Sequence, residues 1–146
     1  PICKKLSEFV LGNRRTAIGK NELVTHIIIP GHSNLGKSHF IKLGSRKYLV
    51  ISISMVSARI YKGDQGNILD AAISVGSCSI VAKRLFELEK TLIGVELSED
   101  IVDLIEDKHL NELSPINDVR STKDYRIKAS KELVIRVLKN IVREYQ

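Results

Sequence analysis

The sequence predicts an α+β domain in which an antiparallel β-sheet of three to four strands is covered on one face by about three helices. In residues 49–61 and 68–77, apolar side chains alternate with polar ones, which is the period of a half-buried strand. After Gly76 the apolar residues follow helical spacing instead. A chain in which strands come first and helices follow indicates an α+β fold rather than a parallel α/β sheet.

The strands are expected in the first half of the chain. Residues 23–29 are rich in β-branched side chains and end at a Pro-Gly pair, which is typical of a strand. Residues 37–46 are expected to form another. A turn sequence with two glycines separates residues 49–61 from residues 68–77, so we expect these two stretches to form an antiparallel hairpin.

Three helices are expected in the second half. The first spans residues 79–92 and ends before Gly94, a residue that often terminates helices. The second begins after Ser98, a favourable N-cap residue, and carries acidic residues in its first turn. A long terminal helix begins near Ser121, which forms a capping-box pattern with Asp124.

Composition excludes several classes of protein. The 146 residues, of which 43% are hydrophobic and 27% charged, suffice for one ordinary core. No apolar run is long enough to span a membrane. Cys3 and Cys78 form no C-x-x-C motif and the histidines form no ligand pair, so we expect neither a metal site nor a disulfide, and a reducing cytoplasm fits best. Because Pro1 stands where an initiator Met would, we expect a piece of a longer protein.

The net charge of +6 and the pI near 9.4 favour a phosphate-bearing or otherwise anionic ligand. Nucleic acid is not the expected partner, because we interpret the basic residues as scattered among acidic ones along the chain and not clustered. The aromatic residues that would stack on bases are also few, with three Phe, four Tyr and no Trp.

One motif points to a nucleotide-binding protein. Residues 31–38 spell G-x-x-x-x-G-K-S, the phosphate-binding loop of P-loop hydrolases, with Gly31, Gly36, Lys37 and Ser38 as its defining residues. Such a loop needs a helix of several turns after it, because the helix N-terminus binds the phosphates. Only a short stretch separates Ser38 from Gly44, and a hairpin follows, so this function is kept as the alternative.

Four segments together resemble the FAD-binding subunit of molybdenum hydroxylases, the family of xanthine dehydrogenase and carbon monoxide dehydrogenase. Residues 9–17 resemble the family's F-F-x-G-x-R-x-T, and residues 21–30 its E-L-L-T-x-I-x-I-P. Residues 40–47 resemble F-x-K-x-x-x-R-R, and residues 115–126 resemble P-x-S-D-x-R-x-S-x-x-Y-R. The segments occur in the family's order across nearly the whole chain.

The resemblance implies that residues 1–36 are the last part of the flavin-binding domain and residues 37–146 the C-terminal α+β domain. It implies FAD as the cofactor of the full-length subunit, whose glycine-rich pyrophosphate-binding segments are absent here. Four residues are implied at the flavin: Lys42 and Arg46 at the edge of the ring, with Phe40, and Val24 through its backbone.

The resemblance further implies an electron-transfer subunit. Similar proteins pass electrons from a molybdenum-cofactor subunit through an iron–sulfur subunit to FAD, and then to NAD or another acceptor. Many relatives carry acidic residues after the basic pair, where this chain has Tyr48, Leu49 and Val50. The remaining alternative is a basic interaction module without a cofactor, in which residues 42–47 form a solvated turn. The charged residues around Asp118 and Arg126 are expected to have a structural role.

Overall fold

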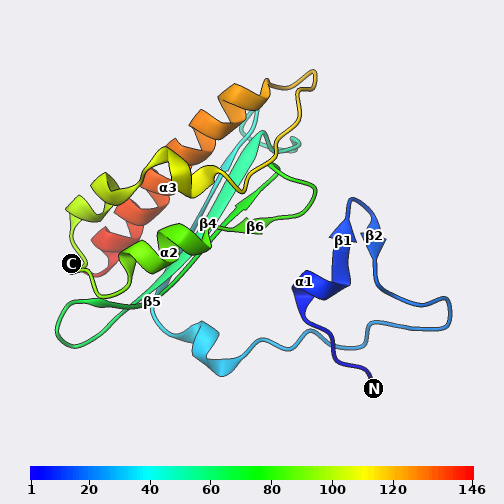
Figure 1. Cartoon of the computed structure of the whole chain (residues 1–146), viewed down its shortest axis with the longest axis horizontal. Coiled ribbons are helices and arrows are strands. Elements are labelled where there is room, and N and C mark those ends of the chain that lie inside the picture. The colour runs from blue at the N-terminus through cyan, green and yellow to red at the C-terminus, as the bar shows by residue number, and fades with distance from the viewer. The chain divides into compact units, whose positions relative to one another are not determined.

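The computed structural model describes residues 1–146, and the chain divides into two compact units, Pro1–Asn34 and Leu35–Gln146 (Figure 1). None of the helices combines the length and apolar character that crossing a membrane requires.

The first unit contains little regular structure. A one-turn helix, α1 (Leu6–Phe9), leads into a small hairpin of β1 (Val10–Gly12) and β2 (Arg15–Thr16), and a 3₁₀ turn, η1, covers Gly31–Asn34. The strand expected over residues 23–29 is not formed, and every residue from 21 to 30 is exposed. The expectation was wrong for this chain because a strand needs a hydrogen-bonded neighbour, and these residues have none.

The second unit is built on a four-stranded antiparallel sheet in the order β3-β4-β5-β6. In chain order its strands are β3 (Lys37–Leu43), β4 (Ser54–Lys62), β5 (Ile68–Gly76) and β6 (Lys83–Arg84). The β4–β5 hairpin expected from the alternating pattern is confirmed, although β4 begins at Ser54 and residues 49–53 belong to a loop.

The helices cover one face of this sheet (Figure 1). The long helix α3 (Lys123–Glu144) lies across β3 and β4, and α2 (Phe86–Leu92) lies against β5. Two 3₁₀ turns, η2 (Glu99–Leu104) and η3 (Asp107–Leu110), connect the two helices. The expected fold class, an antiparallel sheet with helices on one face, is confirmed.

The core lies between this sheet face and the helices. Side chains that alternate along β4 point into it and stand opposite buried partners on β5, as in the pairs Ala58 with Ile73 and Val56 with Val75. From α3, Val134 and Leu138 pack onto the same cluster. One contiguous core therefore holds the second unit together.

The helix expected over residues 79–92 is shorter than predicted. Lys83 and Arg84 form β6 against β5, and the Leu85 N–H donates to the Ile73 carbonyl, so the chain follows the sheet before it turns into α2 at Phe86. The apolar spacing in residues 81–85 is also compatible with a sheet edge, which is why periodicity alone misplaced the helix start.

The expected caps are partly correct. Ser98 is an N-cap, since its hydroxyl accepts the Asp100 N–H at 3.3 Å, but the element it caps is the 3₁₀ turn η2 rather than an α-helix. The terminal helix is capped by Thr122 instead of Ser121, because the Thr122 hydroxyl accepts the Tyr125 N–H at 3.2 Å. Ser121 belongs to the preceding turn, where its N–H donates to Asp118.

Candidate functional site

The loop between β3 and β4, residues 44–53, folds around two basic side chains. The loop closes where the Ile53 N–H donates to the Leu43 carbonyl at 2.8 Å. Lys42 Nζ donates to the Val50 carbonyl at 2.8 Å, and Arg46 Nη2 donates to the Leu49 carbonyl at 2.6 Å. Both cations are therefore fixed on the returning half of the loop, where residues 49–53 lead into β4.

The positive charge of this region is not neutralised locally. Lys42, Arg46 and Lys47 take part in none of the protein's nine ion pairs. Residues 23–63 contain six Lys and Arg and no Asp or Glu, whereas the remaining residues contain 17 of each sign. The formal net charge of +6 thus comes entirely from this segment, and the expectation that basic residues are spread among acidic ones is wrong here.

The loop also exposes apolar side chains. Leu49 is 92% exposed and has a φ of 50°, a left-handed conformation that is uncommon for a non-glycine residue. Tyr48 and Ile51 are exposed as well, and Lys47 Nζ lies 5.2 Å from the centre of the Tyr48 ring. A surface that combines free cations with exposed apolar groups is suited to an anionic ligand that has a flat aromatic part.

Three of the four residues implied at the flavin lie together. Phe40 and Lys42 are two residues apart on β3, so both point to the sheet face opposite the helices, and the Phe40 side chain is 56% exposed. Arg46 lies in the adjoining loop. Val24 belongs to the unit Pro1–Asn34, where it is exposed, and its place relative to the other three is not determined.

The structure does not form a phosphate-binding loop at residues 31–38. Lys37 and Ser38 are the first residues of β3, paired with Ile60 and Arg59, and no helix follows them. The Lys37 N–H donates to the Tyr145 hydroxyl at 3.2 Å, so it is not free to bind a phosphate. The nucleotide-binding alternative based on this motif is therefore wrong.

Gly36 has a structural explanation of its own. Its φ is 90°, and a Cβ at this position would lie 2.0 Å from the Ile60 carbonyl oxygen. Glycine is therefore required for the close approach of the incoming chain to β4, independently of any ligand.

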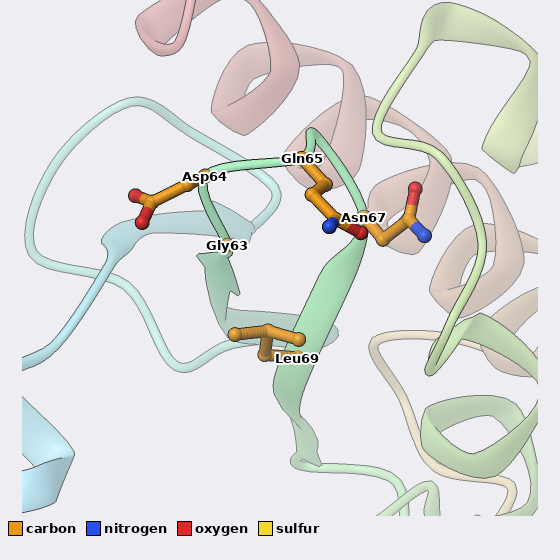
Figure 2. Close-up of a pocket in the computed structure, with 5 residues that line it drawn as sticks. All are labelled: Gly63, Asp64, Gln65, Asn67 and Leu69. Atoms are coloured by element: carbon orange, nitrogen blue, oxygen red, sulfur yellow. The ribbon is translucent and has the colours of Figure 1, made fainter.

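A hollow of about 290 Å³ lies at the opposite end of β4, at the β4–β5 turn. It is lined by Gly63, Asp64, Gln65, Asn67 and Leu69 (Figure 2). Figure 2 shows the Asp64 carboxylate pointing away from the Asn67 amide. Its polar groups do not converge, and β4 separates it from the loop by nine residues, or about 30 Å. The hollow is therefore not part of the candidate site.

Comparisons with known proteins agree with this fold. The glyceraldehyde dehydrogenase medium chain of Sulfolobus acidocaldarius is 29% identical over 140 residues, which cover 94% of this chain and 48% of that protein. Quinoline 2-oxidoreductase from Pseudomonas putida 86 superposes with a TM-score of 0.79 at 21% identity, covering 94% of this chain and 47% of that one.

A carbon monoxide dehydrogenase from Hydrogenophaga pseudoflava superposes with a TM-score of 0.80 at 20% identity, covering 92% of this chain and 46% of that one. The chain thus spans about half the length of the relatives it matches. A family model described as the CO dehydrogenase flavoprotein C-terminal domain matches residues 39–141, which include β3, the loop and most of α3. The chain therefore belongs to the family of CO dehydrogenase flavoprotein C-terminal domains.

Proposed function

We propose that the chain is the C-terminal part of the FAD-containing, electron-transfer subunit of a molybdenum hydroxylase of the xanthine dehydrogenase or carbon monoxide dehydrogenase type. Residues 37–146 would be the C-terminal domain of that subunit, and residues 1–36 the last part of its flavin-binding domain. The exposed apolar residues in positions 23–29 support this division, because a β-prone segment of this kind suits a sheet completed by another part of the subunit.

Family membership implies FAD as the cofactor of the full-length subunit. The residues at the end of β3 and in the adjoining loop fit such a group. Lys42 and Arg46 each use one donor on a loop carbonyl and keep further N–H groups free, and neither faces a carboxylate. Phe40 offers an exposed aromatic ring beside them.

The observation that carries the proposal is the group of unneutralised cations at Lys42, Arg46 and Lys47, in a segment that holds the entire net charge. FAD, when bound, accepts and passes on electrons and becomes more negative on reduction. Fixed positive charge at its edge favours that reduced form, since opposite charges attract more strongly where water is excluded. Lys42 and Arg46 would therefore bind the cofactor and favour its reduction, with Phe40 beside them and Val24 contributing its backbone.

The partners follow from the same proposal. Electrons would reach this subunit from a molybdenum-cofactor subunit through an iron–sulfur subunit, and would leave to NAD or another acceptor. A Cu,Mo-CO dehydrogenase is among the solved structures with this fold, which supports this assignment. The free thiols of Cys3 and Cys78 are compatible with a reducing cytoplasm, which we propose as the compartment.

The test is the flavin reduction potential of the full-length subunit with Lys42→Ala and Arg46→Ala combined. We expect the potential to fall by tens of millivolts, on the order of 1–2 kcal/mol, together with weaker FAD binding. Arg143→Ala is the matched control, because Arg143 is an exposed cation in the last turn of α3, and the neighbouring Tyr145 contacts Ile60 near the end of β4 that is remote from the loop. An unchanged potential and affinity in the double variant would refute the site assignment.

A further inference from the structure

Arg126, in the first turn of α3, joins three segments that are distant in sequence. Its side chain is buried, with 3% exposed. Nη1 donates to the Ile53 carbonyl at 2.6 Å and to the Ser77 carbonyl at 3.3 Å, and Nη2 donates to Asp118 Oδ1 at 2.8 Å. One guanidinium thus connects the end of the 44–53 loop, the chain that leaves β5 and the linker before α3.

Asp118 holds this guanidinium in place. Its Oδ1 also accepts the backbone N–H groups of Arg120 and Ser121, and its Oδ2 accepts from the Arg120 side chain. The Arg120 N–H, followed by the side chains of Arg126 and Arg120, lowers the pKa of Asp118 to about 2. The carboxylate is therefore charged at neutral pH and supplies the opposite charge that a buried cation needs.

The carbonyl groups in this arrangement come from constrained backbone. Ser77, which accepts from Arg126, has a φ of 65°, and Leu49, which accepts from Arg46, has a φ of 50°. Left-handed conformations of non-glycine residues persist only where surrounding contacts hold them. The two arginines supply such contacts at the two positions.

Ile53 connects Arg126 to the candidate flavin site. The carbonyls that bind Arg46 and Lys42 belong to Leu49 and Val50, four and three residues before Ile53. We infer that Arg126 is a positioning residue, which fixes the returning half of the 44–53 loop and thereby the positions of Lys42 and Arg46. The inference rests on the proposed function for its consequence at the flavin, whereas the fixing of the loop is a property of this chain alone.

The geometry requires arginine rather than any cation. Nη1 and Nη2 diverge to reach the Ile53 carbonyl and Asp118 at the same time. Arg126 Nε has no hydrogen-bond partner, so the two Nη groups make all of the hydrogen bonds of this side chain. A lysine ammonium is a single point charge on a flexible stem and cannot reproduce this planar fork. Arg126→Lys should therefore keep the charge and lose the positioning.

The first experiment uses the 146-residue chain with Arg126→Lys and, separately, Asp118→Asn. Two properties are measured: hydrogen exchange of the Ile53 amide, and the rate of tryptic cleavage after Arg46 and Lys47. We expect both rates to rise about tenfold or more in Arg126→Lys and by less in Asp118→Asn, because Asn keeps the backbone contacts and loses the charge. Exchange of the Ala58 and Ile73 amides, in the centre of the sheet, should not change.

Arg136→Lys is the matched control, since Arg136 pairs with Glu132 on the exposed side of the same helix. If Arg126→Lys does not fold, Asp118→Asn carries the test, because the Asp118 contacts lie in the linker rather than in the core. Unchanged exchange and cleavage at the loop in a folded variant would overturn the inference.

The second experiment measures the flavin potential of the full-length subunit with Arg126→Lys. A shift in the same direction as that of the Lys42→Ala and Arg46→Ala variant supports the inference. If the Lys42 and Arg46 changes shift the potential and Arg126→Lys does not, the inference is wrong while the proposed function stands. If only the loop rates change and no variant alters the flavin, the proposed function fails while the fixing of the loop stands.

Discussion

Residues 23–29 and strand β4 have similar β-rich sequences and different structures. In β4, Val56, Ala58 and Ile60 are buried, and the strand is paired on both edges by β3 and β5. In residues 23–29, Ile27 and Ile28 are 84% and 74% exposed, and no backbone pairing is present. The difference shows that a β-rich segment becomes a strand only when neighbouring strands satisfy its backbone groups and a second layer covers its side chains.

The largest expected difference between the two regions is in core stability. Ile73→Ala on β5 removes a fully buried side chain opposite β4 and should lower the free energy of unfolding by about 2–4 kcal/mol. Ile28→Ala, its matched control, removes an exposed side chain and should change it by less than about 0.5 kcal/mol. Urea unfolding monitored by circular dichroism measures both. Equal losses in the two variants would show that residues 23–29 are buried in solution.

Two glycines in the 31–38 motif provide a second comparison. Gly36→Ala should destabilise the second unit by about 1–3 kcal/mol or more, because its φ is 90° and the new Cβ would clash with the Ile60 carbonyl. Gly31→Ala should have little effect, since no atom lies within 4 Å of the position of its Cβ. Thermal unfolding distinguishes the two. A similar result for both glycines would contradict the close packing of residue 36 on β4.

A smaller effect is expected from pH, through His109 of the second unit. Its side chain is buried, and burial, followed by the nearby Lys108, lowers the pKa of the ring. Its Nδ1 accepts the Glu106 N–H at 3.0 Å, which requires the unprotonated nitrogen. Because the folded-state pKa is below the unfolded value of 6.5, this stability is present above that pH and is lost as the pH falls through the folded-state pKa.

The measurement is the urea midpoint between pH 7.5 and pH 5.5. We expect it to decrease with falling pH in the wild type and to decrease less in His109→Gln. His26→Gln, in the exposed 23–29 segment, is the control and should follow the wild type. An identical pH dependence in His109→Gln and the wild type would contradict the prediction.

The smallest expected effect is that of Mg·ATP. Because Lys37 and Ser38 are strand residues, a large excess of Mg·ATP should leave the melting temperature unchanged, and Lys37→Ala should make no difference to this result. A true site would add about 2.7 kcal/mol at a hundredfold excess over its Kd. A shift that is abolished by Lys37→Ala would restore the nucleotide-binding alternative.

Much of the second unit could be predicted from the sequence because its signals are local. The alternation in residues 54–60 and 68–76 identifies two paired strands, and the helical spacing before Tyr145 identifies α3. The motif at residues 40–47 also led to Phe40, Lys42 and Arg46, which the structure brings together. The absence of Asp and Glu from residues 23–63 is a further signal in the sequence, and it marks the same basic segment.

The sequence by itself determined the order of strands and helices, the family and the charged segment, because periodicity, motifs and composition lie along the chain. The tertiary structure alone decided which β-rich stretch was paired, why the chain at Lys83 and Arg84 remains a strand, and which carbonyl Arg126 binds. Each of these outcomes depends on a partner outside the local segment, from Val75, eight residues before Lys83, to Ile53, 73 residues before Arg126. Backbone groups and buried charges must find such partners, and only the folded chain determines where they are.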